Sequence, residues 1–203
     1  MSYAAKLVYN THDWVTPSRD VHDGVGIHVN IGQNGYNFGM EEWLNRPLLR
    51  ERNLGYLDCY RSAAHPGVAD IVRLFTFHDG TVYHIGSLYG VSQLADGEIA
   101  GIRNELNQAN WLGEINRDFV PLGDLRPILQ HIEYQHIWTR NAIVAARGEG
   151  FMLNIEYKKL EMFERNQWRN LTAIDPQVNI KWKKISRRYR VNAALNNLHW
   201  FYT

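Results

Sequence analysis

The chain of 203 residues is 45% hydrophobic, enough for one domain with a sizeable core, and its formal net charge of +1 confines any charge-driven binding to a local patch. Its single cysteine, Cys59, excludes an internal disulfide and a multi-cysteine zinc site and favours a reducing compartment. There is no run of about 18 uncharged apolar residues and no signal-peptide core at the N-terminus, so we expect a soluble, cytoplasmic protein with no membrane partner.

The first third of the chain predicts short elements separated by a long loop. Residues 6–9 form a β-like run that predicts a strand leading into a loop. Residues 18–37 are rich in Gly, Asn, Asp and His and predict a long surface loop with an edge strand over 25–29. Residues 36–44 indicate a turn at a glycine that leads into a short helix. Residues 54–63 alternate apolar and polar side chains as a strand does.

Asp79-Gly80 is the strongest hairpin signal in the sequence, because it joins two apolar runs over 71–78 and 81–91. A two-residue loop at this position sets the register of an antiparallel hairpin. The expected pairs are Phe77 with Val82, Phe75 with His84, and Leu74 with Ile85.

This hairpin carries apolar side chains on both faces, so it must be covered on two sides. That requirement predicts an α+β fold in which a curled antiparallel β-barrel is flanked by helices. Gly86 and Gly90 mark where the second strand bends or lets another backbone approach closely.

The second half of the chain predicts two helices and a strand. Apolar residues recur at helical spacing after Asp96 and again after Asp124, where Pro127 suits a first turn. Residues 151–162 alternate apolar and polar side chains and predict a half-buried strand. The tail from Val178 fits either a strand or a helix.

Four aromatic residues lie in breaker-rich sequence and not in periodic runs: Trp14, Tyr36, Phe38 and Trp43. Aromatic rings on loops can sandwich an unstacked base, with nearby polar groups bonding the base edge. The polar candidates are Asn10, Ser18 and Glu42. The alternative for Phe38 and Trp43 is that they cover one end of the barrel as packing residues.

One concentrated basic segment stands out near the C-terminus. Between positions 181 and 190 it carries six cations and no acid, with Trp182 and Tyr189 interleaved. Such a segment can neutralise several phosphates and bind nucleic acid in a salt-sensitive way, and the alternative is a solvated face. The cations are Lys181, Lys183, Lys184, Arg187, Arg188 and Arg190.

Most catalytic signatures are absent, including a phosphate-binding glycine loop, a GxSxG elbow and an HExxH motif. The best catalytic candidate is Glu156 with Lys158, an E-x-K pattern that resembles metal-dependent nucleases of the PD-(D/E)xK type. No proline-aspartate partner lies upstream at a convincing distance, and a solvated strand face is the simpler explanation of the pattern. We expect no cofactor and no resident metal.

The order of four segments resembles the PUA-like superfamily, which includes the EVE, YTH, ASCH and SRA domains and relatives in modification-dependent restriction proteins. These segments are Trp14 after the first strand, YNFGMEEWL at 36–44, the hairpin ending YHIGSLYGV at 83–91, and LNIEYK at 153–158. The resemblance implies a PUA-like barrel over residues 1–165, followed by a basic C-terminal extension over 166–203.

The resemblance also implies a function. Such domains read a modified base, often flipped out of double-stranded DNA into an aromatic cage. Trp14 and Trp43 would be cage walls with Tyr36 or Phe38 as a third, while Asn10 and Glu42 would read the base edge. No HNH pattern is visible, so a stand-alone reader in a restriction or defence system, or one working with a separate nuclease or motor subunit, fits better than a nuclease. A protein-interaction module is the remaining alternative.

Overall fold

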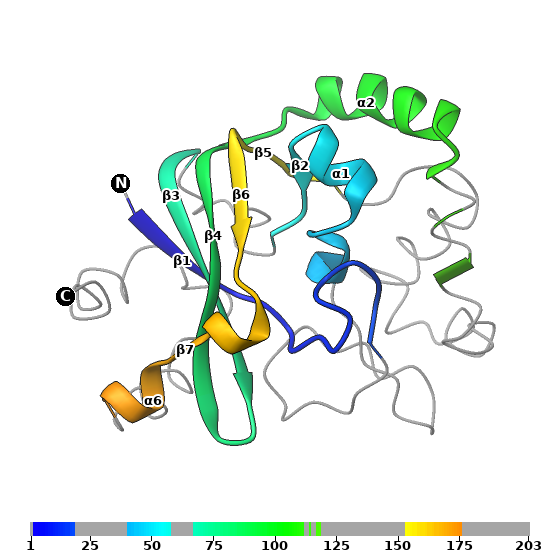
Figure 1. The fold of residues 1–203 in the computed structure, drawn as a ribbon. Coiled ribbons are helices and arrows are strands. Elements are labelled where there is room, and N and C mark those ends of the chain that lie inside the picture. The colour runs from blue at the N-terminus through cyan, green and yellow to red at the C-terminus, as the bar shows by residue number, and fades with distance from the viewer. Residues whose placement is uncertain are drawn as a thin grey trace, which may run out of the picture.

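The computed structural model describes residues 2–18, 40–57, 67–111, 114, 117, 118 and 153–175. Its strands are β1 (Ser2–Lys6), β2 (Leu54–Gly55), β3 (Val68–His78), β4 (Thr81–Gln93), β5 (Ile155–Glu156), β6 (Lys159–Met162) and β7 (Arg169–Asn170). Its helices are α1 (Pro47–Glu51), α2 (Asp96–Gln108) and α6 (Leu171–Ile174), with 3-10 turns η1 (Met40–Trp43) and η6 (Arg165–Gln167). Figure 1 shows their arrangement.

The sheet is built on the β3–β4 hairpin (Figure 1). One edge of β3 carries β1 in parallel, with Ser2 opposite Ile71, and the outer edge of β4 carries β5, β6 and β7, all antiparallel. The strand order is β1-β3-β4-β5-β2. The mixed α+β class is confirmed.

The expected closed antiparallel barrel is wrong, because the described strands form an open seven-stranded sheet whose path ends at β1 on one side and β2 on the other. The hairpin is apolar on both faces, as expected, and this requires cover on two sides. Closure is only one way to supply that cover. Here the core lies under the loop of residues 7–18 and the segment 40–57, which contribute Leu7, Trp14, Leu44 and Leu57 to it.

The hairpin turn is confirmed. Asp79 and Gly80 both have positive φ, 46° and 74°, as a two-residue type I′ turn requires. Two of the three expected pairs form, Phe77 with Val82 and Phe75 with His84. The third pair is wrong: Leu74 faces Gly86, because the register shifts there and leaves Ile85 as an extra residue.

Gly86 is where another backbone approaches β4, as expected. A Cβ atom built on Gly86 would lie 2.3 Å from the carbonyl oxygen of Glu161 on β6. Gly90 has φ of +58° and lies against the methylenes of Lys158. Only glycine lets β6 pair this closely.

The strand expected over 151–162 appears as β5 and β6, separated at Tyr157 and Lys158. Both pieces keep one register along β4, with Ser92 opposite Glu156 and Tyr89 opposite Lys159. The positive φ of Gly90 lies opposite the break. The predicted strand is therefore a single element with a local interruption.

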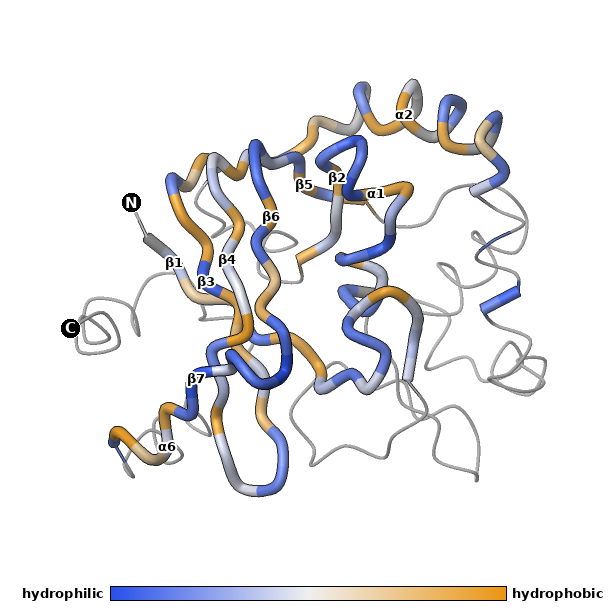
Figure 2. Tube along the Cα trace, viewed as in Figure 1, coloured by the Kyte–Doolittle hydropathy of each residue, from blue (hydrophilic) through white to orange (hydrophobic). Residues whose placement is uncertain are grey.

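Other elements match in part. The strand expected at 6–9 lies earlier, over β1. The short helix expected within 36–44 appears as η1, and Pro47 then opens α1, where its missing N–H costs no hydrogen bond. The helix expected after Asp96 is confirmed as α2, whose apolar residues recur once per turn in Figure 2. None of the helices in the described ranges is both long and apolar enough to cross a membrane.

Several expectations fall outside the described residues. These are the edge strand over 25–29, most of the strand over 54–63, the helix after Asp124 and the tail from Val178. Past residue 165 the described chain still belongs to the sheet: Arg169 pairs with His84, and the backbone N–H of Val82 donates to Thr172 Oγ1 at 2.9 Å.

Candidate nucleic-acid interface

The loop after β1 makes a sharp turn that Asn10 organises. The Asn10 Oδ1 atom accepts from the backbone N–H groups of His12 (2.7 Å) and Trp14 (3.0 Å). Asp13 and Trp14 both have positive φ, 54° and 58°, which is uncommon for residues with a side chain. Two such residues in succession persist only because surrounding contacts fix them.

A buried carboxylate joins this loop to η1. Glu42 is 0% exposed, and its Oε2 atom accepts from Asn10 Nδ2 at 2.6 Å and from the Ser18 backbone N–H at 2.8 Å. The Ser18 hydroxyl lies at 3.5 Å from the same oxygen. The fold thus brings together the three polar residues predicted to contact a base, but it buries all three and they bond one another.

The Glu42 contact also joins two parts of the chain that flank positions 19–39. Ser18 is the last described residue before positions 19–39, and η1 begins at Met40 directly after them. Glu42 therefore ties the two ends of that segment within hydrogen-bond distance. The predicted base-stacking residues Tyr36 and Phe38 belong to this segment and lie outside the described residues.

Trp14 and Trp43 are packing residues in this structure, which corrects their expected role as cage walls. Trp14 is 1% exposed within the core, and its indole N–H donates to the Val8 carbonyl at 3.1 Å. Trp43 is 0% exposed, and its indole N–H donates to Asp118 at 2.7 Å. Neither ring offers a face to a ligand, because both are buried. Large aromatic side chains stabilise a protein most when they are buried.

Arg46 forms a second polar junction that the sequence did not reveal. Its Nε atom bonds Glu114 at 2.8 Å, and its Nη1 atom bonds Asp118, the carboxylate that also accepts from Trp43. Arg46 is itself buried beside α1. This junction fixes the segment around Glu114 and Asp118 against η1.

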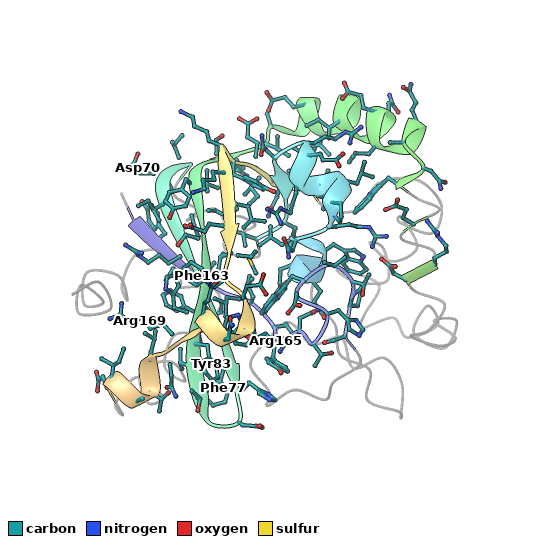
Figure 3. All side chains as sticks on the ribbon, in the orientation of Figure 1. Asp70, Phe77, Tyr83, Phe163, Arg165 and Arg169 are labelled. Carbon is teal, nitrogen blue, oxygen red and sulfur yellow. The ribbon has the colours of Figure 1, made fainter. Side chains whose placement is uncertain are left out.

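Sequence reasoning also missed a group of aromatic and cationic side chains, Tyr9, His78, Arg165 and Trp168, which we call the Arg165 cluster. The rings of Tyr9 and His78 stack in parallel, with centroids 3.7 Å apart and an interplanar angle of 3°. The guanidinium of Arg165 lies 5.7 Å from the Tyr9 ring and 5.0 Å from the Trp168 ring. In Figure 3, Arg165 lies at the same end of the sheet as Tyr83 and Phe77.

The Arg165 cluster is tied to the loop after β1. Arg165 donates to the backbone carbonyl of Asn10 at 2.7 Å and to the Tyr9 hydroxyl at 3.1 Å. Two exposed carboxylates lie at its rim: Asp13 is 3.1 Å from Arg165, and Asp79 is 3.2 Å from His78. The cluster is therefore aromatic and not strongly basic, because one guanidinium lies beside two carboxylates.

His84 illustrates how the fold changes the chemistry of a histidine. Its ring lies between Phe75 and Phe163, with both centroids 5.1 Å away. Burial lowers the pKa of His84 to about 4, and the charges of Arg73 and Arg169 act in the same direction. Ser87 Oγ lies 3.5 Å from His84, but Ser87 is 2% exposed, so this pair is no accessible nucleophile and base.

The E-x-K pair lies on the exposed side of β5 and the residues after it. Glu156 accepts from the Ser92 hydroxyl at 2.8 Å, and Lys158 covers Gly90. Within the described part of the chain, no group of three His, Cys, Asp or Glu side chains could hold a metal ion. The nuclease alternative therefore gains no three-ligand metal site from the described residues.

The six cations of the basic segment, Lys181, Lys183, Lys184, Arg187, Arg188 and Arg190, lie outside the described residues. Their role stays a prediction. Comparison of the chain with models of protein families, with curated proteins and with solved structures gives no match.

Proposed function

We propose that this protein binds nucleic acid and reads a modified base in double-stranded DNA. Residues 19–39 present Tyr36 and Phe38 to the base, and the basic segment of residues 181–190 contacts the phosphates. The observation that carries the proposal is the hydrogen bond from the Ser18 N–H to Glu42 of η1, which joins the described residues on either side of positions 19–39. Loops that a rigid scaffold holds at both ends are frequent binding sites.

The buried residues act as positioning residues in this proposal. Asn10, Ser18 and Glu42 set where the loop begins and ends, while Trp14 and Trp43 anchor its two flanks in the core. A binding site needs this kind of support, because side chains that touch a ligand must be held close to their productive geometry. Loss of a positioning residue weakens base discrimination by loosening the loop.

Phosphate contact and base reading are separate parts of the proposal. Lysine and arginine side chains supply affinity without sequence information, whereas stacking and edge contacts supply discrimination. The resemblance to PUA-like readers supports this division. A separate nuclease or motor subunit would act on the DNA to which this protein binds in the cytoplasm.

A binding screen tests the proposal. Duplexes that carry different cytosine or adenine modifications, and an unmodified duplex, are titrated at two salt concentrations. The expected result is tighter binding to one modified duplex, and Tyr36→Ala and Phe38→Ala should reduce that preference while residual binding persists. Tyr89→Ala, which removes a half-buried ring from the sheet, is the matched control and should keep the preference. Absence of binding to every duplex at low salt would overturn the proposal.

A further inference from the structure

The outer face of His78 is an exposed stacking surface. The His78 side chain is 38% exposed, while its ring stacks on Tyr9 at 3.7 Å and 3°. The inner face of the imidazole is therefore covered by Tyr9, which leaves the outer face as the side on which the stack can continue. A second flat ring fits there by continuing the same stack.

This surface is held in place before any ligand arrives. The Tyr9 hydroxyl accepts from Arg165 at 3.1 Å, and Trp168 meets the Tyr9 ring edge-on with centroids 6.3 Å apart. Arg165 is fixed in turn by the carbonyl of Asn10. Because the rings are already ordered, stacking on them costs little conformational entropy.

The charges at the rim favour a flat neutral ring over a phosphate. Asp13 and Asp79 place exposed carboxylates beside the cluster and offset the positive charge of Arg165. A phosphate would meet no net attraction there, whereas base stacking needs no charge. Unstacked bases expose such ring faces, and bases inside a duplex do not.

We infer that His78, backed by Tyr9, stacks an unpaired nucleobase. The inference rests on the proposed function, since it takes the ligand to be a nucleic acid, and it adds a second contact through a residue outside positions 19–39. It gives the protein affinity for unpaired nucleotides in addition to affinity for duplex DNA.

The test compares a short single-stranded oligonucleotide containing 2-aminopurine with a blunt duplex of the same sequence at low salt. Wild-type protein should bind the single strand and quench its fluorescence. His78→Ala should lower single-strand affinity by roughly 10-fold and remove the quenching, with duplex affinity unchanged. His78→Phe keeps a flat ring and should retain both signals. His12→Ala removes an exposed histidine of the neighbouring loop that bonds Thr16 and Pro17, and should change neither.

The outcomes separate the two proposals. Single-strand binding that His78→Ala leaves unchanged, beside intact duplex binding, overturns the stacking inference and leaves the proposed function standing. A folded His78→Phe protein without quenching, or an equal loss of duplex affinity in His78→Ala, also overturns it. If wild-type protein binds neither oligonucleotide, the proposed function fails and the inference fails with it.

Discussion

The side-chain amide of Asn10 donates to Oε2 of Glu42 over 2.6 Å and joins two segments that lie 32 positions apart in the sequence. Both side chains are fully buried, so removal of either one takes a buried hydrogen bond from the other, while Glu42 keeps its bond from Ser18 and Asn10 keeps its bond to Thr16. Because this contact joins the residues that flank positions 19–39, its strength can be measured as stability and, under the proposed function, as base discrimination.

We expect Glu42→Gln to lower the free energy of unfolding by about 2 kcal/mol, because the amide keeps the shape of the side chain but loses the charge that strengthens the hydrogen bonds from Asn10 and Ser18. Urea unfolding at neutral pH measures the change. Glu51→Gln on the exposed end of α1 is the control and should be neutral. Equal stability of the two variants would contradict the role of Glu42.

Trp14→Ala should lower stability by about 3–5 kcal/mol, the usual cost of emptying a large aromatic site in a core. Trp14→Phe should cost less, because it keeps most of the packing and loses the hydrogen bond to Val8. Thermal unfolding distinguishes the two variants. A stable Trp14→Ala protein that has lost only its preference for a modified base would restore the cage-wall role.

Gly86→Ala should lower the free energy of unfolding, and Gly101→Ala should raise it. A methyl group at Gly86 would meet the backbone of Glu161, so we expect a loss of about 1–3 kcal/mol. A methyl group at Gly101 in α2 meets nothing within 4 Å, so we expect a gain of about 0.5–1 kcal/mol from helix propensity. Melting temperatures report both changes, and a tolerated Gly86→Ala would show that β6 can move away.

His84 should make the protein less stable in mild acid. Its pKa falls from 6.5 to about 4 on folding, so between these values the unfolded chain binds more protons than the folded one. Above pH 6.5 the folded protein has the full stability that neutral His84 contributes. As the pH falls from 6.5 through 4, the free energy of unfolding falls by about 3 kcal/mol in total. Urea unfolding of wild-type protein and His84→Gln at pH 7 and 4.5 tests this, and the variant should show the flatter pH dependence.

Replacing Lys181, Lys183 and Lys184 with glutamine should weaken binding to modified and plain DNA alike. Each lost phosphate contact should reduce the slope of log affinity against log salt by about 1. The control is Lys159→Gln, an exposed lysine of β6 paired with Glu161. A salt slope that stays at the wild-type value would mean that the basic segment does not contact phosphates.

Local signals in the sequence predicted the local structure. The Asp79-Gly80 turn and the spacing of α2 depend on residues close in sequence, and both are confirmed. The bulge at Ile85 could not be predicted in the same way. It lies beside Gly86, which pairs with Met162 of β6, 76 positions further along the chain.

Three of the predicted site residues lie together in the structure, but as a buried cluster. Asn10, Ser18 and Glu42 do meet, but the acidic pair of η1 gave no signal that Glu42 would be buried among them. The Arg165 cluster was missed because Arg165 and Tyr9 lie 156 positions apart. No pattern within a short window can show such a contact.

The parallel pairing of β1 with β3 has a consequence for synthesis. Ser2 lies opposite Ile71, so β1 leaves the ribosome long before its partner exists. At roughly 5–20 residues per second, the nascent strand waits several seconds with its backbone groups unpaired by β3. The β3–β4 hairpin needs only its own neighbours to form, so the newborn chain completes its sheet from the middle outward.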